Sequence, residues 1–180
     1  YHGQRRARRL VGAAMLPRLF QDVYDHPRDD RRRLVLADAL LEQGDVRGEL
    51  IVLQFQTHAT ARKRAQKLID RHRRHFLGPL SGAVLHGSDE WHKGFLVGCA
   101  ARLLGVTADC PAWATVRRLT VVTGGARVPD ELGSRWMTSL ESVQVVSDHH
   151  NFWMRQHEAS VLRRRAQEVL SRANRLALLQ

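Results

Sequence analysis

The 180-residue sequence predicts an α+β fold, in which an N-terminal helical bundle packs on a short stack of β/α units and a C-terminal helix follows. Three observations predict this fold. Apolar residues recur every three or four positions through roughly the first 80 residues, which is the period of an amphipathic helix. From Gly82 onward, Gly, Val and Thr become frequent and short alternating runs replace that period. Two similar six-residue runs then follow each other 24 positions apart.

Turn and cap residues divide the N-terminal half into helices. A helix over residues 5–24 is kinked or divided in two at Pro17, because proline removes a helical hydrogen bond. An aspartate-capped helix then ends at Gly44, where a residue of left-handed conformation fits. Asp45 can cap a third helix, and a basic fourth helix ends before Gly78. The expected core face of the second helix consists of Leu34, Ala37, Leu40 and Leu41.

A short apolar pattern repeats in the second half. The runs VRRLTV, from Val116, and LESVQV, from Leu140, both carry apolar side chains at their first, fourth and sixth positions. Their spacing of 24 lies within the roughly 20 to 29 residues of a leucine-rich repeat. A weaker copy, LVGCAA, begins at Leu96, and Pro129 with Asp130 can start a short return helix. The prediction is a degenerate leucine-rich-repeat-like stack; the alternative is two unrelated strands.

The last segment, His157 to Gln180, has apolar residues spaced by four and three, which predicts an amphipathic helix. Such a helix could cap the stack or bind a partner. The predicted organisation therefore has three regions: a helical region over residues 1–80, a β/α region over 81–155 and a C-terminal helix over 156–180.

Arginine dominates the charged residues and gives the chain a formal net charge of +11. This charge attracts nucleic acid, acidic proteins and anionic lipid without selecting among them. No apolar run approaches the roughly 20 residues that cross a bilayer, so we expect a soluble, cytoplasmic protein with no membrane partner. Cys99 and Cys110 are too few for a disulfide scaffold and fit a reducing compartment.

Residues 26–54, HPRDDRRRLVLADALLEQGDVRGELIVLQ, form a dense motif that resembles the bacterial repeat-companion domain, a short helical module often found beside leucine-rich repeats. The sequence departs from the family pattern at Ala39 and Leu50, where an aromatic residue and Phe are common. The segment WHKGFLVG, over residues 91–98, is similar to the continuation of the family only loosely. The resemblance implies a helical module and brings no established catalytic role. The matching residues are Pro27, Asp29, Asp30, Arg33, Leu34, Val35, Ala37, Asp38, Leu40, Glu42, Gly44, Asp45, Arg47, Gly48, Glu49, Ile51 and Gln54.

Acidic residues within this motif allow two interpretations. Asp38 and Glu42 lie one helical turn apart, a spacing that suits either a shared proton or metal ion, or pairing with arginines. Because arginines flank them, we expect an ionic network that fixes the corner between two helices, since such networks are more often structural than catalytic. The expected ionic corner consists of Arg33, Asp38, Glu42, Asp45, Arg47 and Glu49.

No pattern in the sequence indicates an enzyme. Nucleophile elbows, Walker loops and Cys-x-x-Cys pairs are absent. His72 and His75 are three positions apart, but the neighbouring arginines would repel a cation. The run SDHHNFWMRQH is interpreted as a turn rather than a zinc site, although it supplies Asp148, His149, His150 and His157. We therefore expect a non-catalytic protein without metal or cofactor.

The expected function is protein–protein interaction, as a binding module or as a subunit of a larger bacterial assembly, with an acidic protein as the partner. The predicted partner-binding face consists of the outward residues of the two repeated strands, Arg118, Thr120, Val122, Ser142, Gln144 and Val146. The alternative is binding of an RNA or DNA backbone by the arginine-rich helix, which the low aromatic content of 6% disfavours. The residues for that alternative are Arg62, Lys63, Lys67, Arg71 and Arg74.

Overall fold

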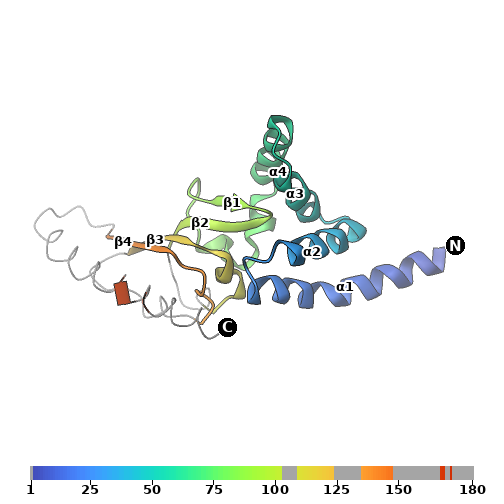
Figure 1. The fold of residues 1–180 in the computed structure, drawn as a ribbon, viewed down its shortest axis with the longest axis horizontal. Helices are drawn as coiled ribbons and strands as arrows, with labels where there is room; N and C mark the ends of the chain where they lie inside the picture. Colours follow the sequence, from blue (N-terminus) through green and yellow to red (C-terminus); the bar gives the residue numbers. More distant parts are fainter. Residues whose placement is uncertain (1, 103–108, 124–134, 148–166, 169–170, 172–180) are drawn as a thin grey trace, which may run out of the picture. The chain divides into compact units, whose positions relative to one another are not determined.

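Four α-helices precede a four-stranded mixed sheet in the described part of the chain, which confirms the predicted α+β class (Figure 1). This computed structural model describes residues 2–102, 109–123, 135–147, 167–168 and 171, with side chains from residue 14. The predicted return helix at Pro129 lies outside these residues, as does nearly all of the predicted helix over 156–180. Within these ranges, no helix combines the length and the apolar character that a membrane span requires.

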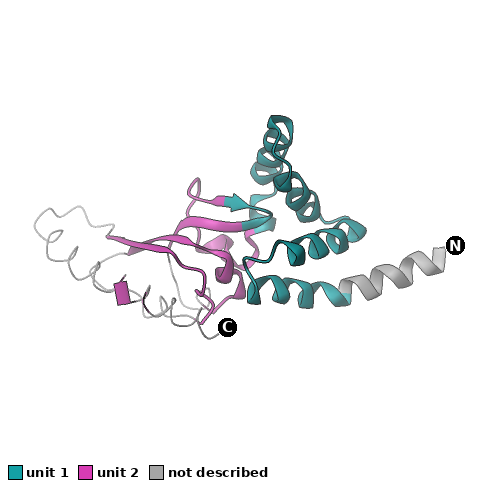
Figure 2. Ribbon diagram, viewed as in Figure 1, with its two compact units in different colours: residues 1–76, 91–95 teal, residues 77–90, 96–180 magenta. Residues whose placement is uncertain are grey.

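Two compact units make up the chain (Figure 2). The helical unit contains residues 1–76 and 91–95, and the sheet unit contains residues 77–90 and 96–180. The first boundary lies close to the predicted one at residue 80. Residues 91–95 belong to the helical unit, although residues 77–90 before them and residues 96–180 after them belong to the sheet unit. We call residues 91–95 the hairpin tip.

The helices are α1 (His2–Asp25), α2 (Asp30–Gln43), α3 (Val46–Phe55) and α4 (Ala59–Leu77). Pro17 lies inside α1, which continues as one helix. The side chain of Asp29 accepts the main-chain N–H of Arg31 at 2.9 Å and caps α2, and Gly44 ends that helix with φ +76°. Asp45 caps α3 in the same way, so the predicted caps at the corner are confirmed.

The core face of α2 differs from the predicted one. Leu34 and Leu41 are 42% and 45% exposed, whereas Ala37, Leu40, Leu36 and Arg33 are buried. Aliphatic side chains occupy nearly every face of this helix, so their period alone does not choose the inward one. The choice is made by the neighbouring helices and by Arg33, whose guanidinium carbon lies 5.5 Å from the centre of the Phe95 ring.

The strands are β1 (Glu90–His92), β2 (Phe95–Ala101), β3 (Arg118–Thr123) and β4 (Ser142–Ser147), adjacent in that order. Strands β2, β3 and β4 are parallel, with Cys99 opposite Leu119 and Leu119 opposite Val143. These offsets of 20 and 24 residues equal the spacings of the three similar runs in the sequence. The runs therefore stack in register, while their assignment to leucine-rich repeats stays a prediction.

The buried face of this stack is aliphatic. The side chains of Leu119, Val121 and Val143 are buried, together with Val116 and Leu140, which precede β3 and β4. Val145 is half-buried. The described part of the sheet unit also contains two short 3₁₀ helices, Gly78–Gly82 and Pro111–Thr115. Cys99 and Cys110 are both buried and are not joined in a disulfide.

Candidate functional site

Alternate side chains of β3 and β4 form an exposed face on the sheet. Pairing in register sets Arg118 beside Ser142, Thr120 beside Gln144 and Val122 beside Val146. Thr120 and Val122 are half-buried and the other four side chains are exposed. Because side chains alternate along a strand, all six lie opposite the buried Leu119, Val121 and Val143. The six residues of the predicted partner-binding face therefore share one side of the sheet, and we call them the strand face.

An ion pair lies at one end of the strand face. Arg118 of β3 donates to the carboxylate of Glu90 of β1, and this hydrogen bond with the carboxylate raises the pKa of Arg118. Between them, β2 contributes Gly98, where an added Cβ atom would lie 2.9 Å from the Glu90 carboxyl carbon. A glycine at this position leaves room for the two charged side chains to meet across the middle strand.

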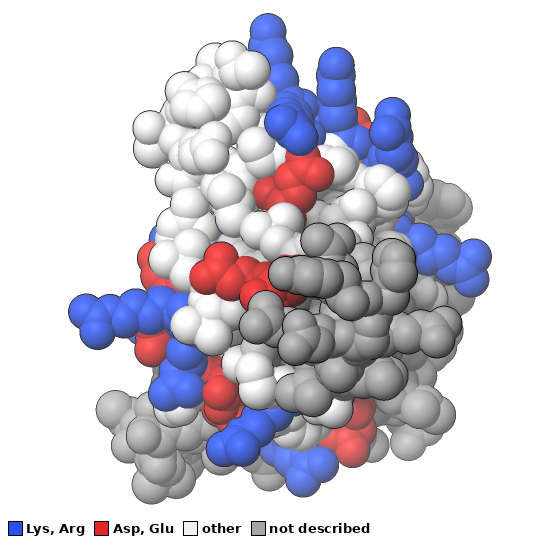
Figure 3. All heavy atoms as spheres, turned by 90° about the vertical axis from the view of Figure 1, so that its right-hand side faces the viewer, with Lys and Arg blue, Asp and Glu red and all other residues white. Residues whose placement is uncertain are grey.

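The alternative nucleic-acid surface lies on α4, and all five of its residues are exposed: Arg62, Lys63, Lys67, Arg71 and Arg74. Four of them, Lys63, Lys67, Arg71 and Arg74, are spaced by four, four and three, which places them along one side of a helix. We call these four the basic stripe. Figure 3 shows Lys and Arg side chains gathered at its top, the part that α4 occupies in Figure 1.

Three features affect the charge along the basic stripe. The backbone at His72 has φ −118° and ψ +18°, so α4 is kinked there and Arg74 lies beyond the kink. Asp70 lies on the same side of the helix and accepts a hydrogen bond from Gln66 at 2.8 Å. The neighbouring Arg64 is paired with Glu49 of α3. The continuous cationic segment is therefore Lys63, Lys67 and Arg71.

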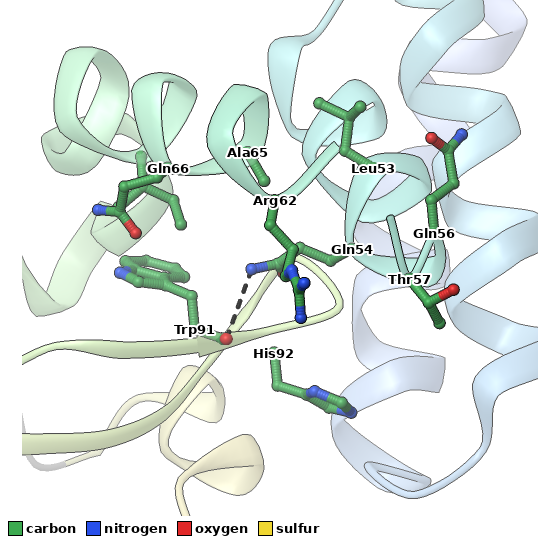
Figure 4. Close-up of a pocket in the computed structure, with 10 residues that line it drawn as sticks. Leu53, Gln54, Gln56, Thr57, Arg62, Ala65, Gln66, Trp91 and His92 are labelled. Atoms are coloured by element: carbon green, nitrogen blue, oxygen red, sulfur yellow. Dashed lines mark hydrogen bonds between the residues drawn. The ribbon is translucent and has the colours of Figure 1, made fainter. Parts of the chain in front are cut away.

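A pocket of about 450 Å³ lies in the helical unit, between the end of α3, the start of α4 and β1 (Figure 4). Its apolar part is made by Leu53, Ala65, Ile69 and the half-buried Trp91. The polar side chains around it include three glutamines, Thr57, Arg62 and His92, and no carboxylate is among its ten lining residues. The guanidinium group of Arg62 beside the aliphatic side chains suits a ligand that is partly apolar and carries negative charge.

The residues of the predicted ionic corner are distributed among separate contacts. Asp38 and Glu42 are exposed on the outer side of α2. Arg33 donates to Asp30, at 3.2 Å, and to the main-chain carbonyl of Pro27. The carboxylate of Asp45 caps α3 and lies 2.9 Å from Nε2 of His75. Two further members face away from this group: Glu49 pairs with Arg64, and Arg47 turns into the core.

Several residues of the motif contact the hairpin tip instead. Gln54 accepts the main-chain N–H of Gly94 at 2.7 Å and donates to the carbonyl of Trp91 at 3.4 Å. Asp30 binds the ammonium group of Lys93, which also lies 4.6 Å from the centre of the Phe55 ring. These contacts join parts of the chain 37 to 63 residues apart. The motif therefore holds a β-turn, an arrangement that the pattern of the motif does not predict.

One signal in the sequence could have indicated this turn. Lys93 and Gly94 stand between two short runs of strand-like residues, and both adopt positive φ, +50° and +80°. A two-residue connection of this kind closes a β-hairpin. The sequence indicates the turn, but it does not indicate which helices the turn contacts.

No cluster of three or more His, Cys, Asp and Glu side chains in the described ranges could hold a metal ion. His72 and His75 both lie within the described part of α4 and contact the ring of Phe76. The other histidine group considered in the sequence, with Asp148, His149, His150 and His157, lies outside the described residues.

Comparison of the chain with family models, curated proteins and solved structures finds no match. The resemblance of residues 26–54 to the repeat-companion domain therefore stays a prediction from the motif itself.

Proposed function

We propose that this chain is a non-catalytic protein-binding module that contacts its partner through the strand face. The observation that carries the proposal is the register of β3 and β4, which sets three pairs of outward side chains side by side on an exposed face. Stacked parallel strands of this kind offer regular rows of side chains, which repeat proteins use as binding surfaces. A resemblance to a module often found beside leucine-rich repeats supports the same interpretation.

The chemistry of the strand face suits a protein partner. Most of its side chains are short and uncharged, so the face offers a flat surface with hydroxyl, amide and methyl groups. Arg118 is already paired with Glu90, so the strand face has little net charge of its own. The net charge of +11 would act at longer range and favour the approach of an acidic protein.

Charged substitutions at the centre of the strand face test the proposal. Replacing Thr120 and Gln144 with Arg adds two long cations to the middle row and should abolish capture of a partner from a lysate of the native host. The matched control replaces Val35 and Leu41 with Arg, which adds the same charge at two exposed positions of α2. A partner retained by the wild type and the control, and lost by the strand variant, supports the proposal. Equal capture by all three proteins would refute it.

A second candidate function is binding of a nucleic-acid backbone, favoured by one observation. Lys63, Lys67 and Arg71 are exposed on one side of a continuous helical segment, so their charges can align with successive phosphates. Binding of this kind weakens steeply as salt increases. Nucleic-acid binding should be reduced in the double variant Lys67→Glu, Arg71→Glu. The control is the double variant Arg18→Glu, Arg31→Glu, which makes an equal change of charge at exposed positions of α1 and α2 and should leave binding unchanged. Failure to retain RNA or DNA at low salt would exclude this function.

A further inference from the structure

We infer that the pocket between α3, α4 and β1 binds a nucleotide, with the ring against the apolar side of the pocket and the phosphate on Arg62. This inference goes beyond the proposed function, because the pocket belongs to the helical unit and contains none of the strand-face residues. It is argued from the shape of the pocket, from its charge and from the hydrogen-bonding groups around it.

The shape of the pocket suits a planar ring. Its volume of about 450 Å³ lies in the range of small-molecule sites, and its lining combines apolar and polar side chains. Ala65 and Ile69, one helical turn apart on α4, are buried beneath it. Trp91 adds an indole ring that is held by an edge contact with Phe76, 5.9 Å between ring centres. Aromatic side chains of this kind stack on nucleobases irrespective of their sequence.

The charge of the pocket selects an anion. Arg62 is exposed and makes no ion pair with any described residue. Its side chain extends from α4 toward β1 in Figure 4. A guanidinium group binds phosphate through parallel hydrogen bonds. An anionic group attached to a bound ring would therefore find its partner at the mouth of the pocket.

The amide side chains around the pocket differ in how many of their hydrogen-bonding groups remain available to a ligand. Both ends of the Gln54 amide are engaged by the main chain of the hairpin tip, so this residue supports the wall of the pocket. Gln66 uses its NH₂ group on Asp70, which leaves its carbonyl oxygen as an acceptor. Gln56 and Thr57 line the other side and are exposed. These groups can hydrogen-bond the edge of a heterocyclic base.

The ligand could be a free mononucleotide or one nucleotide of a strand. Lys63 and Lys67 follow Arg62 and Gln66 directly on α4, so a chain of phosphates leaving the pocket would meet the basic stripe. The same chemistry serves both sources, and competition between the two ligands distinguishes them.

Titration of the full chain with AMP and UMP tests the inference. Binding is measured by calorimetry and by the NMR signal of the Trp91 indole N–H, which is assigned with Trp91→Phe. We expect saturable binding of both nucleotides, with adenosine and inorganic phosphate each at least about tenfold weaker because each offers half of the contacts. Absence of saturable binding of AMP and UMP would overturn the inference.

Two variants on one helix separate the pocket from general charge. Arg62→Gln should weaken AMP binding about tenfold or more, because it removes the contact with the phosphate. Lys67→Gln removes an equal charge from an exposed position that does not line the pocket, and should change the affinity by less than about twofold. An equal loss in both variants would overturn the inference, because binding would then follow net charge. Competition with a thymidine octanucleotide identifies the source of the ligand. If the octanucleotide displaces AMP, the pocket binds one nucleotide of a strand; if it binds without displacing AMP, the pocket binds a free mononucleotide. Both outcomes support the pocket.

Discussion

Nη1 of Arg47 donates a hydrogen bond to the main-chain carbonyl of Gly94, 3.0 Å away and 47 residues later in the sequence. The other terminal nitrogen of this guanidinium binds the carbonyls of His75 and Phe76 at the end of α4. Arg47 is only 8% exposed, and burial lowers the pKa of its guanidinium. A buried cation thus ties α3 both to the end of α4 and to the hairpin tip, through main-chain oxygens rather than through a carboxylate.

We expect Arg47→Met to destabilise the protein by about 2–5 kcal/mol. Methionine fills part of the volume but leaves buried carbonyl groups without their donor, and each unsatisfied group costs roughly 1–3 kcal/mol. The measurement is the free energy of unfolding from urea denaturation, followed by circular dichroism. Arg64→Met is the control, because Arg64 is 67% exposed and its pair with Glu49 should contribute less than about 1 kcal/mol. Equal losses in the two variants would show that Arg47 does not have this anchoring role.

Gly94→Ala should destabilise the protein more than Gly87→Ala. Both glycines have positive φ, +80° and +76°, so both substitutions strain the backbone. A Cβ atom at Gly94 would overlap Cγ1 of Ile51, whereas one at Gly87 would have nothing within 4 Å. The difference in unfolding free energy therefore reports overpacking alone, and we expect about 1–3 kcal/mol. In a double-mutant cycle, Ile51→Ala together with Gly94→Ala should cost less than the sum of the two single substitutions, because alanine at position 51 removes the overlap; additive losses would contradict the assigned contact.

Local features of the sequence were sufficient to predict the helix caps, and the predicted repeat spacing agrees with the strand register. Asp45 and Gly44 act on neighbouring main-chain groups, so their type and position indicate a helix start and a helix end. The register of β3 and β4 follows from the 24-residue spacing of Val116 and Leu140, because a parallel stack places equivalent residues opposite each other. Contacts of short range or fixed period are visible in a single sequence.

Contacts that depend on tertiary packing were not predictable in this way. Arg47 and Gln54 stand among charged and aliphatic neighbours, and nothing near them indicates a turn 40 residues later. The prediction of an ionic corner assumed that oppositely charged residues close in sequence would pair. Asp38 and Glu42 lie on the outer side of α2 instead, because α2 turns Arg33 and Leu36 into the core.

The stability of the protein should fall in acid, and Asp45 should account for part of the loss. Burial acts to raise the pKa of Asp45, but the main-chain N–H of Arg47 and the imidazole of His75 outweigh it and hold that pKa below its ordinary value of 3.8. A carboxyl with a lowered folded pKa stabilises the protein above the unfolded pKa, and this contribution is lost as pH falls through the folded pKa.

Asp45→Asn isolates this effect, because asparagine still caps a helix but cannot ionise. The variant should be less stable than the wild type near about pH 6, and the difference should shrink as the pH falls below about 4. Urea midpoints at several pH values provide the measurement. Asp38→Asn is the control, since Asp38 is exposed on α2. A difference between wild type and Asp45→Asn that stays constant across this range would contradict the prediction.

Glu90 and Arg118 provide the opposite case to Arg47, because their ion pair lies on the surface. Each side chain is 55% exposed, so water screens the attraction and both groups remain solvated when the pair is broken. We expect Arg118→Gln and Glu90→Gln each to cost less than about 1 kcal/mol, and a double-mutant cycle to give a coupling of similar or smaller size that weakens in high salt. A coupling above about 2 kcal/mol would mean that water reaches this ion pair less than the 55% exposure of its side chains indicates. The strand face would then be less open to solvent, which would argue against its use as a binding surface.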